Sequence, residues 1–306
     1  MKQVGVIGIG NMGLAMAARL REGGWAVHVC DIDAARCDQA SALGLTVQPT
    51  PAAVVRALPA NGLLVVAVVN AAQCRDVMWG DPTPDGHAWA DDAAAVALQA
   101  GQTVMWCPTM APEDVVSLAD RLALQGVDSI DAPMSGGPAR ARVGTMSLMV
   151  AGAEAVVARH EAVLAQLAQP VFRLGERLGD GARTKLVNNL LAGINLVGAA
   201  EVLALAGQMG LDLGQTLEVI EQSSGQSWIA SDRMRRAVAG DLNPRAHMSL
   251  LAKDTGLAQQ AAASAGFAGP LGARAAAVFA AACERGLSDL DDGALLLFLQ
   301  QHGQVR

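Results

Sequence analysis

Lys185 and Asn189 are the residues whose types and spacing best suit acid–base chemistry in this chain. They lie four positions apart in a predicted helix and therefore share one of its faces. The helix is mostly apolar, and a lysine that points from it into a cleft is partly desolvated, which favours the neutral amine that accepts a proton. Asn189 can bind the same substrate by hydrogen bonds. Helix spacing alone fits an ordinary solvated lysine equally well.

A turn rich in glycine and proline follows a predicted strand, with the sequence Asp131-Ala132-Pro133-Met134-Ser135-Gly136-Gly137-Pro138. Its glycines expose backbone N–H groups in a shape that suits an anion, so a carboxylate can bind there. A purely structural turn is the alternative, because proline and glycine dominate turns regardless of function.

The run VGVIGIGNMGLAMAARL at residues 4–20 combines a β-strand, a glycine turn and the start of a helix. Gly8, Gly10 and Gly13 have the GxGxxG spacing of a dinucleotide-binding turn, in which the glycines allow a tight turn, close approach of a pyrophosphate, and strand–helix packing. The N–H groups of the intervening Ile9, Asn11 and Met12 belong to the same predicted cofactor site. The alternative is a glycine-rich turn that binds nothing.

Asp31 ends the next predicted strand, about 20 residues past the glycines, as the dinucleotide fingerprint expects. A carboxylate there accepts hydrogen bonds from the adenosine ribose of NAD and repels the 2′-phosphate of NADP. NAD is therefore the favoured cofactor, although Arg36 is close enough to leave NADP open. The alternative role for Asp31 is to cap the following helix near Asp33.

Strands and helices alternate through the first 174 residues. The predicted strands are 3–8, 26–31, 62–69, 103–107, 128–131, 145–151 and 169–173. Such alternation predicts a parallel, doubly wound α/β sheet. Ligands of these sheets bind outside the carboxyl ends of the strands, which brings Val69, Asn70 and Thr109 next to the cofactor. The polar loop 80–92 is also expected beside the cleft.

Residues 175–306 are predicted to form an all-helical second domain. Helical patterns fill 181–208, 213–223, 227–239, 245–265, 271–285 and 289–302, with start signals at Asp212, Pro270 and Asp289. The apolar run 186–206 is long enough to span a membrane, but polar residues interrupt it, so we interpret it as a buried core helix. Its large apolar surface favours a homo-oligomer.

Composition narrows the class of protein. The chain has 306 residues, 52% of them hydrophobic and 17% charged, which is typical of a soluble protein with room for two domains. A net charge of −7 without a basic cluster argues against nucleic acid or membrane as partner and favours a small ligand. Five scattered cysteines lack metal-ligand spacing, so no metal is expected. Reduced thiols, and a first strand that leaves no room for a signal peptide, indicate a cytoplasmic location.

Four motifs in order resemble the β-hydroxyacid dehydrogenase family over nearly the whole chain: GIGNMG at 8–13, DAPMSGG at 131–137, GDGARTKLVNN at 179–189 and Lys253-Asp254. The resemblance implies a Rossmann-type domain followed by a helical domain, assembled as homodimers or homotetramers. It implies that Lys185 is the catalytic acid or base and that Asn189 binds substrate. It also assigns Ser135, Gly136 and Gly137 to the substrate carboxylate and Lys253 to the region near the nicotinamide.

One departure and two segments refine the resemblance. Pro108 stands where relatives more often have serine, so only Thr109 is carried over from that motif. Residues 69–73 and Ser227-Trp228 look most like the L-threonate dehydrogenase branch, which suggests a polar four-carbon acid and places Trp228 in the substrate pocket. Trp228 is as easily interpreted as a core residue.

The leading prediction is reversible hydride transfer between a small 3-hydroxy (or 2-hydroxy) carboxylic acid, such as 3-hydroxyisobutyrate or L-threonate, and NAD, with Lys185 as general acid or base. A second prediction is the reverse reaction, the reduction of tartronate semialdehyde, glyoxylate or succinic semialdehyde by NAD(P)H. A third is a dinucleotide-binding protein without turnover.

Overall fold

The computed structural model describes residues 2–302 and divides into two compact units, Met1–Lys185 and Leu186–Arg306. The division falls inside one long helix, α9 (Asp180–Gln208), whose first residues belong to the first unit.

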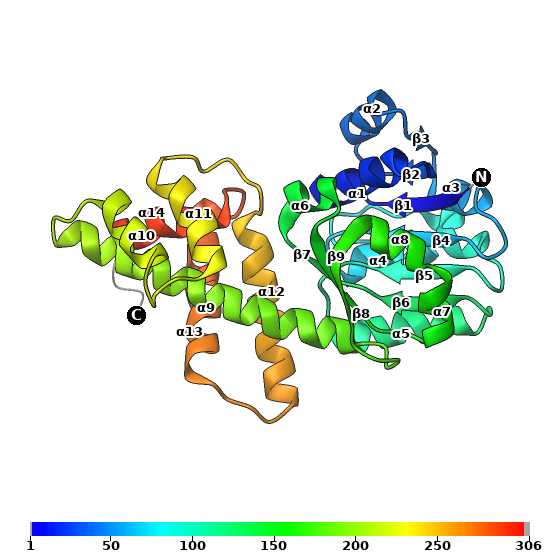
Figure 1. Cartoon of the computed structure of the whole chain (residues 1–306). Coiled ribbons are helices and arrows are strands. Elements are labelled where there is room, and N and C mark those ends of the chain that lie inside the picture. Colours follow the sequence, from blue (N-terminus) through cyan, green and yellow to red (C-terminus); the bar gives the residue numbers. More distant parts are fainter. Residues whose placement is uncertain (1, 303–306) are drawn as a thin grey trace. The chain divides into compact units, whose positions relative to one another are not determined.

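The first unit is built on a six-stranded parallel sheet with the strand order β3-β2-β1-β4-β5-β6 (Figure 1). Its strands are β1 (Gln3–Ile7), β2 (Ala26–Cys30), β3 (Thr46–Val47), β4 (Leu63–Val66), β5 (Thr103–Trp106) and β6 (Asp128–Asp131). Successive residues of β4 enter two different apolar cores, Leu63 and Val65 on one face and Leu64 and Val66 on the other. Burial on both faces explains the unbroken aliphatic run of this strand and confirms the predicted α/β class.

The last two predicted strands do not join this sheet. They form β8 (Met146–Val150) and β9 (Ala168–Arg173), which pair in parallel, and β8 also pairs antiparallel with the short β7 (Met134–Ser135). This second sheet is connected to β6 by one isolated bridge between Asp131 and Ala151. The prediction of a single sheet through residue 173 was therefore wrong, because alternation along the chain does not specify which strands pair.

Eight α-helices of the first unit connect and cover the strands. They are α1 (Asn11–Glu22), α2 (Ala34–Ala42), α3 (Pro51–Arg56), α4 (Ala71–Trp79), α5 (Pro112–Ala123), α6 (Gly137–Val143), α7 (Glu154–Arg159) and α8 (Glu161–Leu167). Several begin at a capping side chain; Asn70, for example, accepts a hydrogen bond from the Gln73 N–H at the start of α4. These caps position the loops at the carboxyl ends of the strands.

Within residues 186–302 the structure is helical, as predicted, with one isolated bridge between His247 and Asp291. Beyond α9 the α-helices are α10 (Leu213–Glu221), α11 (Trp228–Val238), α12 (Met248–Ser264), α13 (Pro270–Ala282) and α14 (Leu295–His302). Asp212 caps α10, and Pro270 occupies the first turn of α13, as expected. The cap predicted at Asp289 is wrong: Asp291 accepts the Gly293 N–H at the start of the final helical segment.

Helix α9 is less buried than predicted. It is long and apolar enough to cross a membrane by length and composition alone, yet only 33% of its most apolar window is buried. Leu196, Ala200 and Leu203 enter the core of the second unit, whereas Val187 and Leu205 are exposed. The interpretation as a buried core helix therefore holds for one face only, because apolar side chains are distributed around the whole circumference of this helix.

Candidate active site

The glycine turn after β1 has the geometry of a dinucleotide-binding turn. Gly8 has a φ of 85°, which favours glycine, and a Cβ on Gly13 would lie 1.9 Å from the Gly8 carbonyl oxygen. A Cβ on Gly10 would meet nothing within 4 Å, and Gly10 precedes α1 without a side-chain cap. The turn is therefore closed where strand and helix pack and open above Gly10, where a pyrophosphate fits.

Alanine substitutions should separate these two glycine roles. We expect Gly13→Ala to lower the free energy of unfolding by about 1–3 kcal/mol, because its methyl group meets backbone that cannot move independently. Gly10→Ala should unfold like the wild type but bind NAD at least tenfold more weakly, because its methyl group occupies the phosphate space. Denaturant titration and calorimetric binding measure the two effects. Equal stability losses in both variants would contradict this interpretation.

Asp31 ties the end of β2 to the glycine turn. Its Oδ2 accepts a hydrogen bond from the Ile9 N–H at 2.6 Å, and its Oδ1 accepts one from the Asp33 N–H at 2.9 Å. The cap of α2 is Asp33 rather than Asp31, because the Asp33 carboxylate accepts the Ala35 N–H. A carboxylate offers about four acceptor positions, so Asp31 can still accept hydrogen bonds from a ribose diol.

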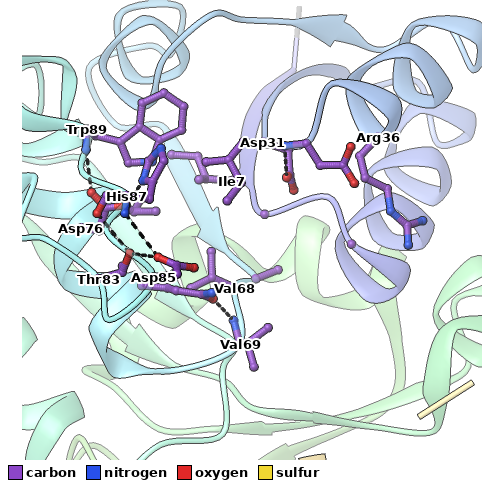
Figure 2. Close-up of a pocket in the computed structure, with 17 residues that line it drawn as sticks. Ile7, Asp31, Arg36, Val68, Val69, Asp76, Thr83, Asp85, His87 and Trp89 are labelled. Carbon is purple, nitrogen blue, oxygen red and sulfur yellow. Dashed lines mark hydrogen bonds and ion pairs between the residues drawn. The ribbon is translucent and has the colours of Figure 1, made fainter. Parts of the chain in front are cut away.

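A pocket in the first unit contains the glycine turn and Asp31 (Figure 2). Of the predicted cofactor residues, Gly8, Gly10, Asp31 and Val69 line it. The other predicted cofactor residues of this unit do not line the pocket; they are Ile9, Asn11, Met12, Gly13, Asn70 and Thr109. The Asn70 side chain instead caps α4, a structural role that the sequence did not suggest.

Sequence reasoning assigned no residue of the polar loop to the cofactor site, yet Thr83, Asp85, His87 and Trp89 line this pocket. The loop had been expected beside the cleft on polarity alone, and that expectation is confirmed. Arg36 also lines the pocket, and its Nη2 donates to Asn11 Oδ1 at 3.0 Å. Arg36 is the one arginine among the described residues of this lining and lies in the same pocket as Asp31.

The predicted anion turn follows β7. Gly136 and Gly137 have φ values of 122° and 73°, in the region that favours glycine, and α6 begins at Gly137. Gly136 precedes this helix without a side-chain cap, and Ser135 is half-buried beside it. Backbone N–H groups in such a turn can bind a carboxylate.

Lys185 is buried, with 7% of its surface exposed. The alternative of an ordinary solvated lysine is therefore wrong. The chain has three lysines, Lys2, Lys185 and Lys253, and nineteen arginines. Lysine can release its proton, whereas arginine effectively cannot. Because this chain uses arginine at most of its basic positions, the choice of lysine at a buried position indicates a role in proton transfer rather than simple charge pairing.

In the second unit, Asn189 is buried and its amide is fixed by two neighbours. Its Nδ2 donates to Asp254 Oδ2 at 2.6 Å, and its Oδ1 accepts from Asn188 Nδ2 at 3.0 Å. Lys253 Nζ lies 2.7 Å from Asp254 Oδ1. Asp254 thus holds two predicted site residues, a role that its place beside Lys253 in the sequence could have suggested. Trp228 begins α11 and is 54% exposed, so its interpretation as a core residue is wrong.

Known proteins resemble this chain over nearly its whole length. Residues 3–175 match the NAD binding domain of 6-phosphogluconate dehydrogenase, and residues 179–299 match the family described as NAD-binding of NADP-dependent 3-hydroxyisobutyrate dehydrogenase. L-threonate dehydrogenase of Cupriavidus necator is 34% identical over 96% of this chain and 95% of that protein. The chain belongs to the β-hydroxyacid dehydrogenase family.

Two further members of the family are similar over nearly the whole chain. The mitochondrial 3-hydroxyisobutyrate dehydrogenase of Drosophila melanogaster is 31% identical over 95% of this chain and 87% of that protein. The crystal structure of 3-hydroxyisobutyrate dehydrogenase from Salmonella typhimurium superposes with a TM-score of 0.86 at 31% identity, covering 97% of this chain and all of that one. This β-hydroxyacid dehydrogenase is accordingly an NAD(P)-binding oxidoreductase that acts on hydroxyacids.

Asp131, the first residue of the predicted anion turn, has a structural role that the sequence did not suggest. Its Oδ2 accepts hydrogen bonds from the Gly179 and Ala182 N–H groups, both at 3.0 Å, at the start of α9. Burial raises the pKa of this carboxyl to about 6, against the opposing effect of its N–H donors. Asp131 therefore connects the strand before the anion turn to the helix that carries Lys185.

Proposed function

We propose that this dehydrogenase catalyses reversible hydride transfer between a small 3-hydroxy (or 2-hydroxy) carboxylic acid and NAD, with Lys185 as general acid or base. The observation that carries the proposal is the burial of Lys185 one helical turn from Asn189. Bound NAD supplies the hydride acceptor. Lys185 takes the proton from the substrate hydroxyl as the carbon loses hydride.

The remaining roles follow from the donors on the chain. We propose that Ser135 and the N–H groups of Gly136 and Gly137 bind the substrate carboxylate. Asn189 has two amide hydrogens, of which Asp254 accepts one, so the other can orient the substrate hydroxyl. Lys253 is proposed near the nicotinamide and Trp228 in the substrate pocket. Binding the substrate in a fixed orientation raises the reaction rate, because less translational and rotational entropy is then lost on reaching the transition state.

The proposed substrate is a polar four-carbon acid, supported by relatives named L-threonate dehydrogenase. The test is a screen of L-threonate, 3-hydroxyisobutyrate, D-glycerate, serine and 4-hydroxybutyrate with NAD and with NADP, followed by absorbance of the reduced cofactor. We expect the highest kcat/KM for L-threonate with NAD. If NAD binds tightly but no acid is oxidised, the enzymatic proposal fails and a binding protein without turnover is supported.

We propose NAD as the preferred cofactor, supported by Asp31 at the ribose position. We expect Asp31→Asn to lower the NAD-to-NADP ratio of kcat/KM by about ten- to hundredfold, because a carboxylate facing a phosphate is strongly unfavourable. The amide oxygen can still accept the Ile9 N–H, so the turn should be preserved. Asp38→Asn, which removes an exposed charge of α2 outside the pocket lining, should change the ratio less than threefold. A ratio unchanged by Asp31→Asn would contradict this role.

We further propose a soluble, cytoplasmic homodimer or homotetramer whose partner is a small carboxylate rather than nucleic acid or membrane. Exposed apolar side chains of the second unit support self-association; they are Val187, Leu191, Val202, Leu205, Met209, Val219, Phe267 and Leu271. Light scattering is expected to give a mass of two or four chains. A mass of one chain would contradict the proposal.

A further inference from the structure

The loop after α4 contributes a whole wall of the dinucleotide pocket. Thr83, Asp85, His87 and Trp89 line it opposite the residues that follow β2 (Figure 2). A dinucleotide with its pyrophosphate at Gly10 and its adenosine ribose at Asp31 must place its base beyond that ribose. The base then lies in the part of the pocket that this loop encloses.

Two exposed aliphatic side chains make this part of the pocket suitable for a flat ring. Ile32 and Val69 line the pocket and are 58% and 47% exposed, although both are large and apolar. Covering them with a purine removes apolar surface from water. Stacking between aliphatic side chains binds any purine, however, so recognition of a particular base requires a polar group.

His87 is a polar group of this loop whose ring is held in a fixed orientation. Its Nδ1 lies 2.5 Å from Oδ2 of Asp76, a buried residue of α4, and Asp76 Oδ1 accepts the Trp89 N–H at 2.6 Å. The Trp89 ring packs edge-on against the imidazole, with centroids 4.9 Å apart. The Thr83 hydroxyl donates to the His87 carbonyl oxygen at 3.0 Å, so both the ring and the backbone of His87 are fixed.

The contact with Asp76 also determines which nitrogen carries the hydrogen. An ionised carboxylate only accepts hydrogen bonds, so Nδ1 of His87 must donate to it. We take the ring in its neutral form, in which Nε2 is then an acceptor. Among the bases of natural dinucleotides, the group that matches an acceptor is the 6-amino group of adenine.

We propose that the loop of residues 80–89 recognises the adenine base, with Nε2 of His87 accepting a hydrogen bond from the 6-amino group. Hypoxanthine carries a carbonyl oxygen at that position, which would face the lone pair of Nε2. The inference rests on the dinucleotide site of the proposed function but not on its hydroxyacid substrate. His87 is thus a determinant of base specificity, and Asp76 is a positioning residue that acts through it.

The test compares two cofactors by calorimetric binding without substrate: NAD and nicotinamide hypoxanthine dinucleotide. The wild type should bind NAD about three- to tenfold more tightly, the range expected for one hydrogen bond. His87→Ala should weaken NAD binding by the same factor and bind both dinucleotides equally. His87→Gln, which restores an acceptor, should recover part of the preference. His247→Ala, which removes a histidine of the second unit, should leave both dissociation constants unchanged.

Asp76→Asn tests the positioning role. The amide can donate to Nδ1, which allows the ring to carry its hydrogen on Nε2, so the preference for NAD should disappear or reverse. A thermal melt close to that of the wild type would show that the loop change has not unfolded the first unit. If the melting temperature of Asp76→Asn is lowered, the comparison of His87→Ala with His87→Gln tests the base recognition instead.

Equal affinity of the wild type for the two dinucleotides, or full preference retained by His87→Ala, would overturn the inference. These outcomes are independent of the proposed reaction. Base discrimination without oxidation of any hydroxyacid would overturn the proposed function and support the role of His87. Oxidation without base discrimination would do the opposite.

Discussion

Replacing Lys185 with alanine is expected to lower kcat by about 10²- to 10⁴-fold, the range typical of a lost general acid or base. The affinity for NAD should change less than threefold, because the glycine turn, Asp31 and the loop of residues 80–89 are untouched. Lys185 is buried on α9, so the substitution removes a desolvated amine rather than a surface charge. Steady-state kinetics with the best hydroxyacid and calorimetric binding of NAD measure the two effects.

Two variants separate proton transfer from charge. Lys185→Arg retains a positive charge but cannot give up its proton in the working range, so it should remain nearly as inactive as the alanine variant. Lys2→Ala removes a lysine that lies over the Trp25 ring and precedes β1, at the opposite end of that strand from the glycine turn, and should leave kcat unchanged. Near-normal turnover by Lys185→Ala would overturn the general-base role. Near-normal turnover by Lys185→Arg would show that the charge alone is needed.

The dinucleotide turn could be predicted from the sequence because its geometry is local. Gly8, Gly10 and Gly13 lie within six residues, and their spacing specifies both the open and the closed side of the turn. The same holds for helix starts such as Asp212, where the capping side chain and its N–H partner are three positions apart. The contacts of such motifs are made between residues close together in the chain, so a single sequence is sufficient to predict them.

The residues that hold the site together could not be predicted, because their partners are distant in the chain. Asp131 accepts N–H groups 48 and 51 positions away, and Asp254 accepts the Asn189 amide 65 positions away. The second sheet was missed for a related reason, since strand pairing depends on which segments meet in space. The burial of α9 was misjudged because a helix with apolar side chains around its whole circumference does not indicate which face is covered.

Replacing Asp131 is expected to affect both stability and activity, since it caps the helix that carries Lys185. Asp131→Ala leaves the buried N–H groups of Gly179 and Ala182 without their acceptor, and we expect the free energy of unfolding at pH 7 to fall by about 1–3 kcal/mol. Activity should fall as well, because the start of α9 is no longer fixed. Asp131→Asn retains an acceptor oxygen and should keep most of the activity. Equal activity losses in both variants would contradict a capping role.

The pH dependence of stability tests the charge on Asp131 independently. Burial raises its pKa to about 6 in the folded protein, compared with about 3.9 in an unfolded chain. Between these two values the folded state retains a proton on Asp131 that the unfolded state has released. The contribution of the protonated Asp131 to the free energy of unfolding is therefore fully present below about pH 4 and is lost as the pH rises through about 6. The free energy of unfolding of the wild type relative to Asp131→Asn should therefore increase by about 1–3 kcal/mol as the pH is lowered from 7 to 4.

Denaturant titrations of both proteins across this range give the difference directly. The comparison isolates Asp131 because other titrating groups are common to both proteins. Asp292, for example, has a pKa raised by burial to about 7, but it lies in the second unit and its titration cancels in the difference. A difference that stays constant from pH 7 to 4 would mean that the carboxyl titrates alike in the folded and unfolded states. The cap of α9 would then be an ordinary carboxylate, ionised throughout the working range, and hydrogen bonding to the N–H groups would offset the effect of burial on its pKa.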